Sequence, residues 1–320
     1  MTKLVIQIPC LNEAEHLPMT LGDLPKSIPG IDEIEVVVID DGSHDATSEV
    51  ARAHGAQAVV RHKRTLGLAA AFRTGLEECV RRGADFIVNT DADNQYRGED
   101  VARLVRPLLE KGADLVVGDR GVGTLELFPR HKRLLQRFGS WVISKASGLE
   151  IPDATSGFRA LTRETALRLI VLGTYSYTLE SLIHAGNAGM TVKFVPITVN
   201  PPTRPSRLMR GASDYVRTSS VAIVRAYTLR RPLFVFAVIG AVLMALGLIP
   251  GVRFLYLRAQ GQSGHVQSLI LCAILLLMGF QSWLAGLLSD LVASNRKLLE
   301  ELVMRARERD HEVEKRADRS

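Results

Sequence analysis

Short apolar runs alternate with longer amphipathic segments through the first 120 residues of the chain. Turn-forming residues bound the apolar runs, which predicts strands, and the segments between them carry apolar residues at helical spacing. The predicted strands span residues 4–9, 34–40, 56–62, 84–93 and 113–120, and the predicted helices span 12–24, 44–55, 66–83 and 98–112. Apolar strands that alternate with helices predict an α/β domain with a mostly parallel sheet, covered by helices on both faces.

The pattern is looser after residue 120. A basic amphipathic helix is expected within 121–148, a loop followed by a helix over 152–170, and a further helix over 176–189. The run TVKFVPITV at 191–199 predicts one more strand, and a Pro- and Arg-rich loop follows it. We therefore expect one folded domain over 1–210 and an amphipathic helix at a membrane surface over 211–231.

Two long runs near the C-terminus contain no charged side chain. They span 233–249 and 266–289, with lengths of 17 and 24 residues. A helix needs about 20 apolar residues to cross a bilayer, so the two runs predict a transmembrane hairpin within 232–290. A buried core helix is the alternative for the shorter run. The residues expected to serve helix–helix packing are Gln267, Gln281, Gly279 and Gly286.

Basic residues on the outer flanks of the hairpin favour a topology with both ends of the chain inside. They are Arg225, Arg230 and Arg231 before the first run, and Arg296 and Lys297 after the second. The N-terminus has no signal-peptide pattern. We therefore expect a multi-pass protein of the cell membrane with a cytoplasmic N-terminal domain. The tail, 291–320, is expected to be a solvated helix that suits self-association, so a homo-oligomer is possible.

The composition narrows the classes of partner. The net charge of +6 permits nucleic acid, but aromatic residues make up only 6% and no stacking stripe interleaves the arginines, so that class is excluded. Arginines beside a membrane fit anionic lipid or phosphate instead. Cys10, Cys79 and Cys272 have neither metal nor disulfide spacing, as expected for a reducing compartment.

Acidic residues gather at the ends of three predicted strands, at Asp40 and Asp41, at Asp91 and Asp93, and at Asp119. Ligands of open parallel sheets lie beyond the carboxyl ends of the strands. In an extended chain, Asp91 and Asp93 point to the same side, where their charges repel unless a cation lies between them. An ordinary turn is the alternative, since Asp and Asn favour turns.

Six motifs occur in the order seen in family 2 glycosyltransferases. They are IPCLNEAEHL, VVVIDDGSHDAT, LGLAAAFRTGL, NTDADNQY, GDR and DATSGFRAL. Together with the hairpin, the chain resembles the polyprenyl-phosphate glycosyltransferases, a group that includes dolichol-phosphate mannose synthases. The resemblance covers roughly residues 3 to 230 and implies a GT-A catalytic domain, which is Rossmann-like, followed by two transmembrane helices.

On the donor side, the resemblance implies a nucleotide-sugar and a divalent cation, Mg²⁺ or Mn²⁺. Asp93 is expected to bind the cation directly and Asp91 directly or through water, with Gln95 as the third metal contact. Hard cations commonly combine one or two carboxylates with substrate phosphates. The other residues expected to bind the donor are Pro9, Asn12, Glu13, Asp40, Asp41, Gly67 and Ala92. Among these, Asp41 is the expected base contact, Asp40 has a structural alternative, and Glu13 is expected to reach the ribose, whereas Asn12 has helix capping as its alternative.

On the acceptor side, the resemblance implies a polyprenyl phosphate. Guanidinium groups bind phosphate in a bidentate manner, so the expected acceptor contacts include Arg120, Arg133, Arg159 and Arg207. A solvated surface role is the alternative for each of these arginines. Asp153 is expected near the reacting centre with Arg159 and Asp93 as the catalytic set. Ser156 and Glu180 are expected to contact substrate, and capping of local structure is the alternative for Glu180.

These expectations combine into one enzymatic reaction. The phosphate acceptor is already anionic, so we expect direct transfer of one sugar with inversion at the anomeric carbon, on the cytoplasmic side of the bilayer. A processive polysaccharide synthase is a rival within the fold, although QRFGSW lacks the spacing of its Gln-x-x-Arg-Trp motif. A catalytically silent membrane scaffold is the rival from another class.

Overall fold

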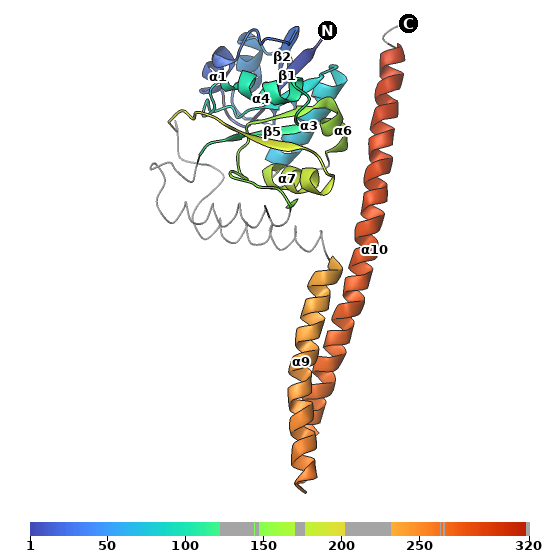
Figure 1. Cartoon of the computed structure of the whole chain (residues 1–320). Coiled ribbons are helices and arrows are strands. Elements are labelled where there is room, and N and C mark those ends of the chain that lie inside the picture. Colours follow the sequence, from blue (N-terminus) through green and yellow to red (C-terminus); the bar gives the residue numbers. More distant parts are fainter. Residues whose placement is uncertain are drawn as a thin grey trace. The chain divides into compact units, whose positions relative to one another are not determined.

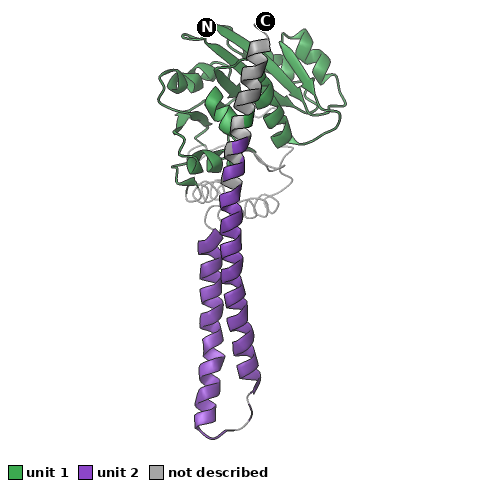
Figure 2. Ribbon diagram, turned by 90° about the vertical axis from the view of Figure 1, so that its right-hand side faces the viewer, with its two compact units in different colours: residues 1–223, 303–320 green, residues 224–302 purple. Residues whose placement is uncertain are grey.

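A computed structural model of the chain describes residues 1–121, 144, 147–169, 177–201, 232–262, 264 and 266–317. It divides into two compact units, residues 1–223 with 303–320 and residues 224–302 (Figure 2). The predicted amphipathic helix at 211–231 and the basic helix predicted within 121–148 fall outside the described residues, apart from a few positions at 144 and 147–148.

The first unit is built on a seven-stranded sheet with the order β3-β2-β1-β4-β6-β5-β7. Of these strands, Figure 1 labels β1, β2 and β5. The strands are β1 (Lys3–Cys10), β2 (Glu33–Asp40), β3 (Ala58–Arg61), β4 (Phe86–Asn89), β5 (Leu115–Asp119), β6 (Arg159–Thr162) and β7 (Val192–Pro196). Within this sheet β6 runs antiparallel to both of its neighbours, and the other pairings are parallel. The predicted mostly parallel α/β sheet is therefore confirmed.

Helices pack on both faces of the sheet because its strands are apolar on both sides. In β1, Val5 joins a core formed with α3 (Leu68–Arg81), α6 (Arg163–Arg168) and α7 (Tyr177–Asn187). Leu4, Ile6 and Ile8 join the opposite core with α1 (Leu17–Asp23), α2 (Thr47–Ala53) and α4 (Asp100–Leu109). Adjacent strand residues point to opposite faces, so each strand contributes to both cores.

Three local predictions need correction. The segment 152–170 was expected to be a loop and a helix, but its middle forms strand β6 between β4 and β5. The first helix begins at Leu17 rather than near residue 12, after a turn in which Asn12 has a φ of 55°. The fourth strand ends at Asn89, so Asp91 and Asp93 lie in a loop and not in the extended strand that the alternation argument assumed.

The second unit contains the long helix α9 (Pro232–Ala259) and the greater part of the long helix α10 (Val266–Ala317), whose residues from 303 on belong to the first unit. Both are long and apolar enough to cross a membrane, over Pro232–Ala259 and Val266–Asn295, and only 17% of the most apolar window of each is buried. They are therefore candidate membrane helices rather than core helices. α10 continues without a break through the predicted boundary at residue 290.

Small residues bring α9 and α10 close together, as expected for Gly279 and Gly286. A β-carbon at Gly279 would lie 2.8 Å from the carbonyl oxygen of Gly240, and one at Gly286 would lie 2.9 Å from the β-carbon of Phe236. The indole nitrogen of Trp283 donates to the carbonyl of Ala237 at 3.1 Å. By contrast, Gln267 and Gln281 are exposed, so their predicted packing role is wrong within this unit.

Candidate active site

The loop that follows β4 carries the paired acids. Asp91 and Asp93 are half-buried, and the backbone N–H of Gln95 donates to Oδ1 of Asp93 at 3.1 Å, closing a tight turn. Asn94, between Asp93 and Gln95, has a φ of 53°, a left-handed conformation that Asn tolerates better than most residues. The loop is thus a tight turn that carries two carboxylates, and we call residues 91–97 the metal loop after the cation that the sequence predicts there.

Asp91 faces an environment that opposes its negative charge. Burial, followed by the neighbouring Asp93 carboxylate, raises the pKa of Asp91 to about 7. A β-carbon at Gly157 would lie 3.0 Å and 3.1 Å from the two carboxylate oxygens of Asp91. Only glycine therefore leaves room for this carboxylate, and a cation beside it would relieve its repulsion from Asp93.

A buried polar network supports Gly157 from below. Its carbonyl accepts from Nδ2 of Asn89 at 2.8 Å, and Asn89 also donates to the Tyr177 hydroxyl at 3.0 Å. Gln7 donates to Oδ1 of Asn89 at 2.9 Å, so the network reaches into β1. The N–H of Gly157 donates to the hydroxyl of Tyr96 at 3.1 Å, and Tyr96 belongs to the metal loop. The network thereby fixes the segment around Gly157 against the loop that carries the acids.

An ion pair joins the end of β5 to the loop before β6. Arg120 donates from Nε and Nη2 to the two oxygens of Asp153 at 2.7 Å and 2.9 Å, and from Nη2 to the Thr155 hydroxyl at 2.6 Å. Burial opposes the charge on Asp153, but the bonds from Arg120 and Thr155 outweigh it and hold the pKa of Asp153 below its ordinary value. Two predicted residues from different segments thus form one bidentate pair.

Arg159 lies beneath the same loop with no exposed surface. Its Nε donates to the carbonyl of Ser156 at 2.9 Å, Nη2 to the carbonyl of Ala154 at 3.3 Å, and Nη1 to the hydroxyl of Ser181. Burial lowers the pKa of Arg159 to about 10. In the structure Arg159 therefore supports the 154–156 loop, and its contact with acceptor phosphate stays a prediction.

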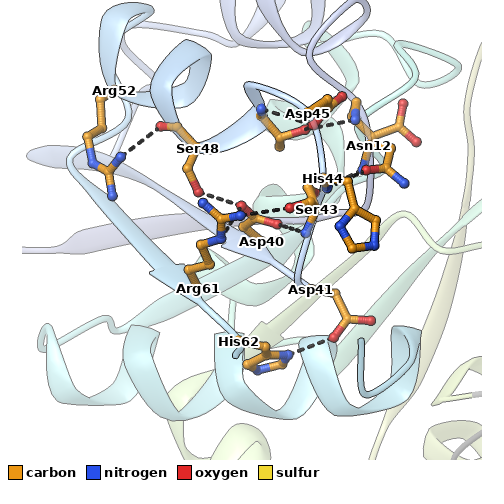
Figure 3. A network of polar contacts seen from close by, with 12 residues as sticks. Asn12, Asp40, Asp41, Ser43, His44, Asp45, Ser48, Arg52, Arg61 and His62 are labelled. Atoms are coloured by element: carbon orange, nitrogen blue, oxygen red, sulfur yellow. Dashed lines mark hydrogen bonds and ion pairs between the residues drawn. The ribbon is translucent and has the colours of Figure 1, made fainter. Parts of the chain in front are cut away.

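Asp40 and Asp41 end β2 but point to different partners (Figure 3). Asp40 is fully buried and accepts from the N–H of Ser43 at 2.7 Å and from the Ser48 hydroxyl, with Nε of Arg61 at 3.5 Å. Burial raises its pKa, but these bonds prevail and lower the pKa of Asp40 overall. Asp40 thus holds the turn after β2, which is the structural alternative.

Asp41 holds the segment that leads into α3. Its carboxylate accepts from the N–H groups of Leu66 and Gly67 at 2.9 Å and 2.8 Å and lies 2.7 Å from Nδ1 of His62. Gly67 precedes α3 with a φ of 97°, a conformation that suits glycine. The predicted residues Asp41 and Gly67 are therefore brought into direct contact.

The turn after β1 is joined to the turn after β2. The N–H of Asn12 donates to the Ser43 hydroxyl at 2.9 Å, and its side-chain oxygen accepts from the N–H of His44 at 2.8 Å (Figure 3). The N–H of Glu13 donates to the Thr47 hydroxyl at 2.9 Å. Asn12 and Glu13 thus lie beside the Asp40 turn, as a shared donor pocket would require.

The remaining predicted residues divide by location. Pro9 is buried in β1, and Ala92 is buried with its carbonyl accepting from the Thr20 hydroxyl at 2.8 Å. Ser156 is buried, and its hydroxyl oxygen has no hydrogen-bond partner within the described part of the chain. Glu180 is half-buried in the first turn of α7. Arg133 and Arg207 lie outside the described residues.

Several residues of the site escaped sequence reasoning. Tyr96 and Tyr177 resembled ordinary core aromatics, and His62 stood in a basic run, so no local pattern distinguished them. Asn89 was the one detectable signal, because an amide within an apolar, buried strand segment must find a partner. Their roles depend on partners distant in sequence, which a motif does not reveal.

The donor set fits a hard cation held jointly with substrate. Among the described residues no group of three or more His, Cys, Asp or Glu side chains is arranged to hold a metal ion. Asp91 and Asp93 would offer two carboxylates to such a cation, and the repulsion at Asp91 favours a positive charge there. Such a site needs phosphate oxygens from a substrate to complete its coordination.

Fold and site together define a glycosyltransferase of the GT-A class. The profile described as "Glycosyl transferase family 2" matches residues 5–169, and the chain belongs to that family. Its site lies at the carboxyl ends of β1, β2, β4 and β5, where such α/β sheets bind ligands.

Curated relatives share this domain. A "Polyprenol monophosphomannose synthase" of Mycolicibacterium smegmatis is 32% identical over 205 residues, 61% of this chain and 76% of that protein. An "Undecaprenyl-phosphate mannosyltransferase" of Micrococcus luteus is 34% identical over 202 residues, 60% of this chain and 81% of its own. The "Glycosyltransferase AglJ" of Haloferax volcanii is 29% identical over 309 residues, 93% and 97% of the two chains. The last match therefore includes the C-terminal helices.

A solved structure confirms the fold. The glucosyl-3-phosphoglycerate synthase of Mycobacterium tuberculosis, crystallised with Mn²⁺, UDP and glucosyl-3-phosphoglycerate, matches with a TM-score of 0.52 and 22% identity. The match covers 72% of this chain and 80% of that one. At this identity the likeness concerns the fold alone.

Proposed function

We propose that the chain transfers one hexose from a nucleotide-sugar to a polyprenyl phosphate at the cytoplasmic face of a membrane. The observation that carries the proposal is the meeting of two charged groups at Gly157. The Asp91 carboxylate, which the neighbouring Asp93 carboxylate repels, lies beside Gly157, and Asp153, which pairs with Arg120, belongs to the loop that leads into it. A donor diphosphate and an anionic acceptor need these two kinds of partner side by side.

On the donor side, Asp91, Asp93 and Gln95 would hold Mg²⁺ or Mn²⁺. A bound cation would neutralise the charge that develops on the departing diphosphate. Asp41 and Glu13 would line the nucleotide end of the pocket, and Asp40 and Asn12 would keep the turns there in register. The solved relative with Mn²⁺ and UDP in its crystals supports a donor of this type.

On the acceptor side, Arg120 would bind the acceptor phosphate and Asp153 would hold the guanidinium in position. An oxygen of the acceptor phosphate forms the bond to the anomeric carbon, while the bond from that carbon to the diphosphate breaks. The nucleoside diphosphate leaves with the electron pair, and the configuration at that carbon inverts. Because the acceptor oxygen is already anionic, no side chain has to remove a proton.

The acceptor class is supported by the relatives and by the apolar helices. Two of the relatives are named for mannose transfer involving polyprenol or undecaprenyl phosphate. α9 and α10 have mean hydropathies of 2.6 and 2.0 in their spans, as a membrane anchor requires. We propose a catalytic domain over 1–210, a surface helix over 211–231, a hairpin over 232–290 and a cytoplasmic tail.

The decisive experiment uses the full chain in detergent with a short-chain polyprenyl phosphate, Mg²⁺ or Mn²⁺, and a panel of GDP- and UDP-hexoses. Mass spectrometry of the lipid product should detect transfer of one sugar with one donor, mannose being the first hexose to try. Asp93→Asn should abolish transfer while the protein remains folded. Normal turnover in that variant would refute the metal role, and absence of donor binding by the wild type would favour the scaffold alternative.

A further inference from the structure

The position of the metal loop is not determined by the sheet. β4 ends at Asn89, before the loop begins, so no strand ladder holds Asp93 or Gln95. Asn94 adopts a left-handed conformation, and its side-chain oxygen is buried with no hydrogen-bond partner among the described residues. Contacts from other segments must therefore hold this turn.

The segment after β7 supplies such contacts through Asn200. Its Nδ2 donates to the carbonyl of Asn94 at 2.9 Å, and its backbone N–H donates to the carbonyl of Gln95 at 2.9 Å. Its Oδ1 accepts from Nε of Arg97 at 3.2 Å. One residue, 106 positions away from Asn94, thus contacts three residues of the metal loop.

The segment that carries Asn200 is itself anchored. The N–H of Ile197 donates to the carbonyl of Asp119 at 2.9 Å, which extends the pairing of β7 with β5. The N–H of Thr198 donates to the buried carboxylate of Asp100 at 2.9 Å, and Val199 forms an antiparallel bridge with Tyr96. Asn200 therefore connects the metal loop to the sheet at β7.

We propose that Asn200 is a positioning residue that sets the geometry of the metal ligands Asp93 and Gln95. The inference rests on the proposed function, because it concerns the cation of that site. Asn200 contacts neither carboxylate. It acts by fixing the backbone on both sides of the turn, whose remaining closure is the bond from Gln95 to Asp93. Contacts that orient metal ligands commonly change metal affinity between about 10-fold and 100-fold when removed.

The test measures binding of Mn²⁺ by the full chain in detergent, from the loss of the free-ion EPR signal, without nucleotide and with UDP or GDP. Asn200→Asp keeps the size and the acceptor for Arg97 but loses the donor to Asn94, and Asn200→Ala loses both side-chain bonds. Both variants should weaken Mn²⁺ binding about 10-fold or more. The Mn²⁺ concentration for half-maximal transfer should rise by the same factor.

Asp114→Ala is the matched control. Its carboxylate accepts from the N–H of Thr191 at 2.7 Å, just before the other end of β7, so the variant removes a similar contact far from the metal loop. It should bind Mn²⁺ like the wild type, and thermal unfolding compares the stability of all variants. If Asn200→Asp does not fold, Arg97→Ala replaces it, because this variant removes the bond to Oδ1 of Asn200 by changing a more exposed side chain. It should likewise weaken Mn²⁺ binding.

The outcomes separate two claims. Equal Mn²⁺ binding by the wild type and by a folded Asn200→Asp variant would overturn the role of Asn200 alone. Absence of Mn²⁺ binding by the wild type, with and without nucleotide, would overturn the proposed metal dependence and this inference with it. Equal weakening by Asp114→Ala and Asn200→Asp would reduce Asn200 to a general contribution to stability, which also overturns the positioning role.

Discussion

Gly157→Ala is the most direct probe of the crowded centre of the site. The added methyl carbon would lie 2.8 Å from the Tyr177 hydroxyl and 3.0 Å and 3.1 Å from the Asp91 carboxylate oxygens, where ordinary contact begins at 3.4 Å. The carboxylate must therefore retreat by about 0.4 Å if the backbone stays in place. Metal–ligand distances tolerate deviations of about 0.2 Å, so the displacement is about twice what a cation accepts.

We expect this variant to fold and to lose metal binding and transfer together. Overpacking of this kind costs about 1–3 kcal/mol of unfolding free energy, which most folded domains survive. Mn²⁺ affinity by EPR and transfer to polyprenyl phosphate should both fall by more than about 10-fold. The reason is the movement of Asp91, because Gly157 itself has no side chain that binds substrate.

Gly22→Ala is the control for this prediction. Gly22 is in α1, and a β-carbon there would meet no atom within 4 Å, so the change should leave Mn²⁺ affinity and transfer as in the wild type. Its effect on stability should be small and favourable, up to about 1 kcal/mol, because alanine is the better helix former. Wild-type Mn²⁺ affinity and turnover in Gly157→Ala would refute the argument that Asp91 needs this space.

Two further predictions concern stability and the helical hairpin. Asp40→Asn should lower the free energy of unfolding at pH 7 by about 2 kcal/mol, because buried charge-assisted hydrogen bonds are lost. Since the folded state lowers the pKa of Asp40, its contribution is present above the unfolded value and is lost as the pH falls through the folded one. Urea midpoints of the two proteins should thus converge in acid, and a constant difference down to pH 3 would contradict this. In the hairpin, a β-carbon at Gly251 would lie 3.8 Å from that of Cys272, which matches the mean disulfide separation of about 3.8 Å. Oxidised Gly251→Cys protein should yield a disulfide-linked peptide pair by mass spectrometry, and its absence would contradict the α9–α10 pairing.

Sequence reasoning predicted the sheet well where burial on both faces leaves a simple pattern. β1 is apolar at nearly every position because both cores use it, and its predicted span differs from the observed one by a residue at each end. β6 was missed because Arg159–Thr162 is only four residues long and shows neither a continuous apolar run nor an alternating pattern. Its strand conformation comes from pairing with β4 and β5, which no local pattern contains.

The candidate site shows the same division between local and distant causes. The motif around Asp91 and Asp93 identified the loop, but the alternation argument assumed an extended chain, and the turn at Asn94 replaces it. Arg159 was chosen because a guanidinium in the motif suits phosphate, yet its burial beneath the loop depends on Ser181 in α7. The chemistry of single residues was therefore readable, whereas their orientation depended on tertiary partners.

The construction of the metal loop explains why these distant partners matter. A loop outside the sheet has no ladder of backbone hydrogen bonds, so its geometry is set by whatever neighbours it contacts. Here the Thr20 hydroxyl binds the Ala92 carbonyl, the Tyr96 hydroxyl accepts from Gly157, and Asn200 binds the carbonyls of the turn. Because Tyr96 joins the metal loop to the segment that carries Asp153, the donor and acceptor sides share one set of constraints. A change on either side should therefore affect the other through position, without any direct contact between cation and acceptor.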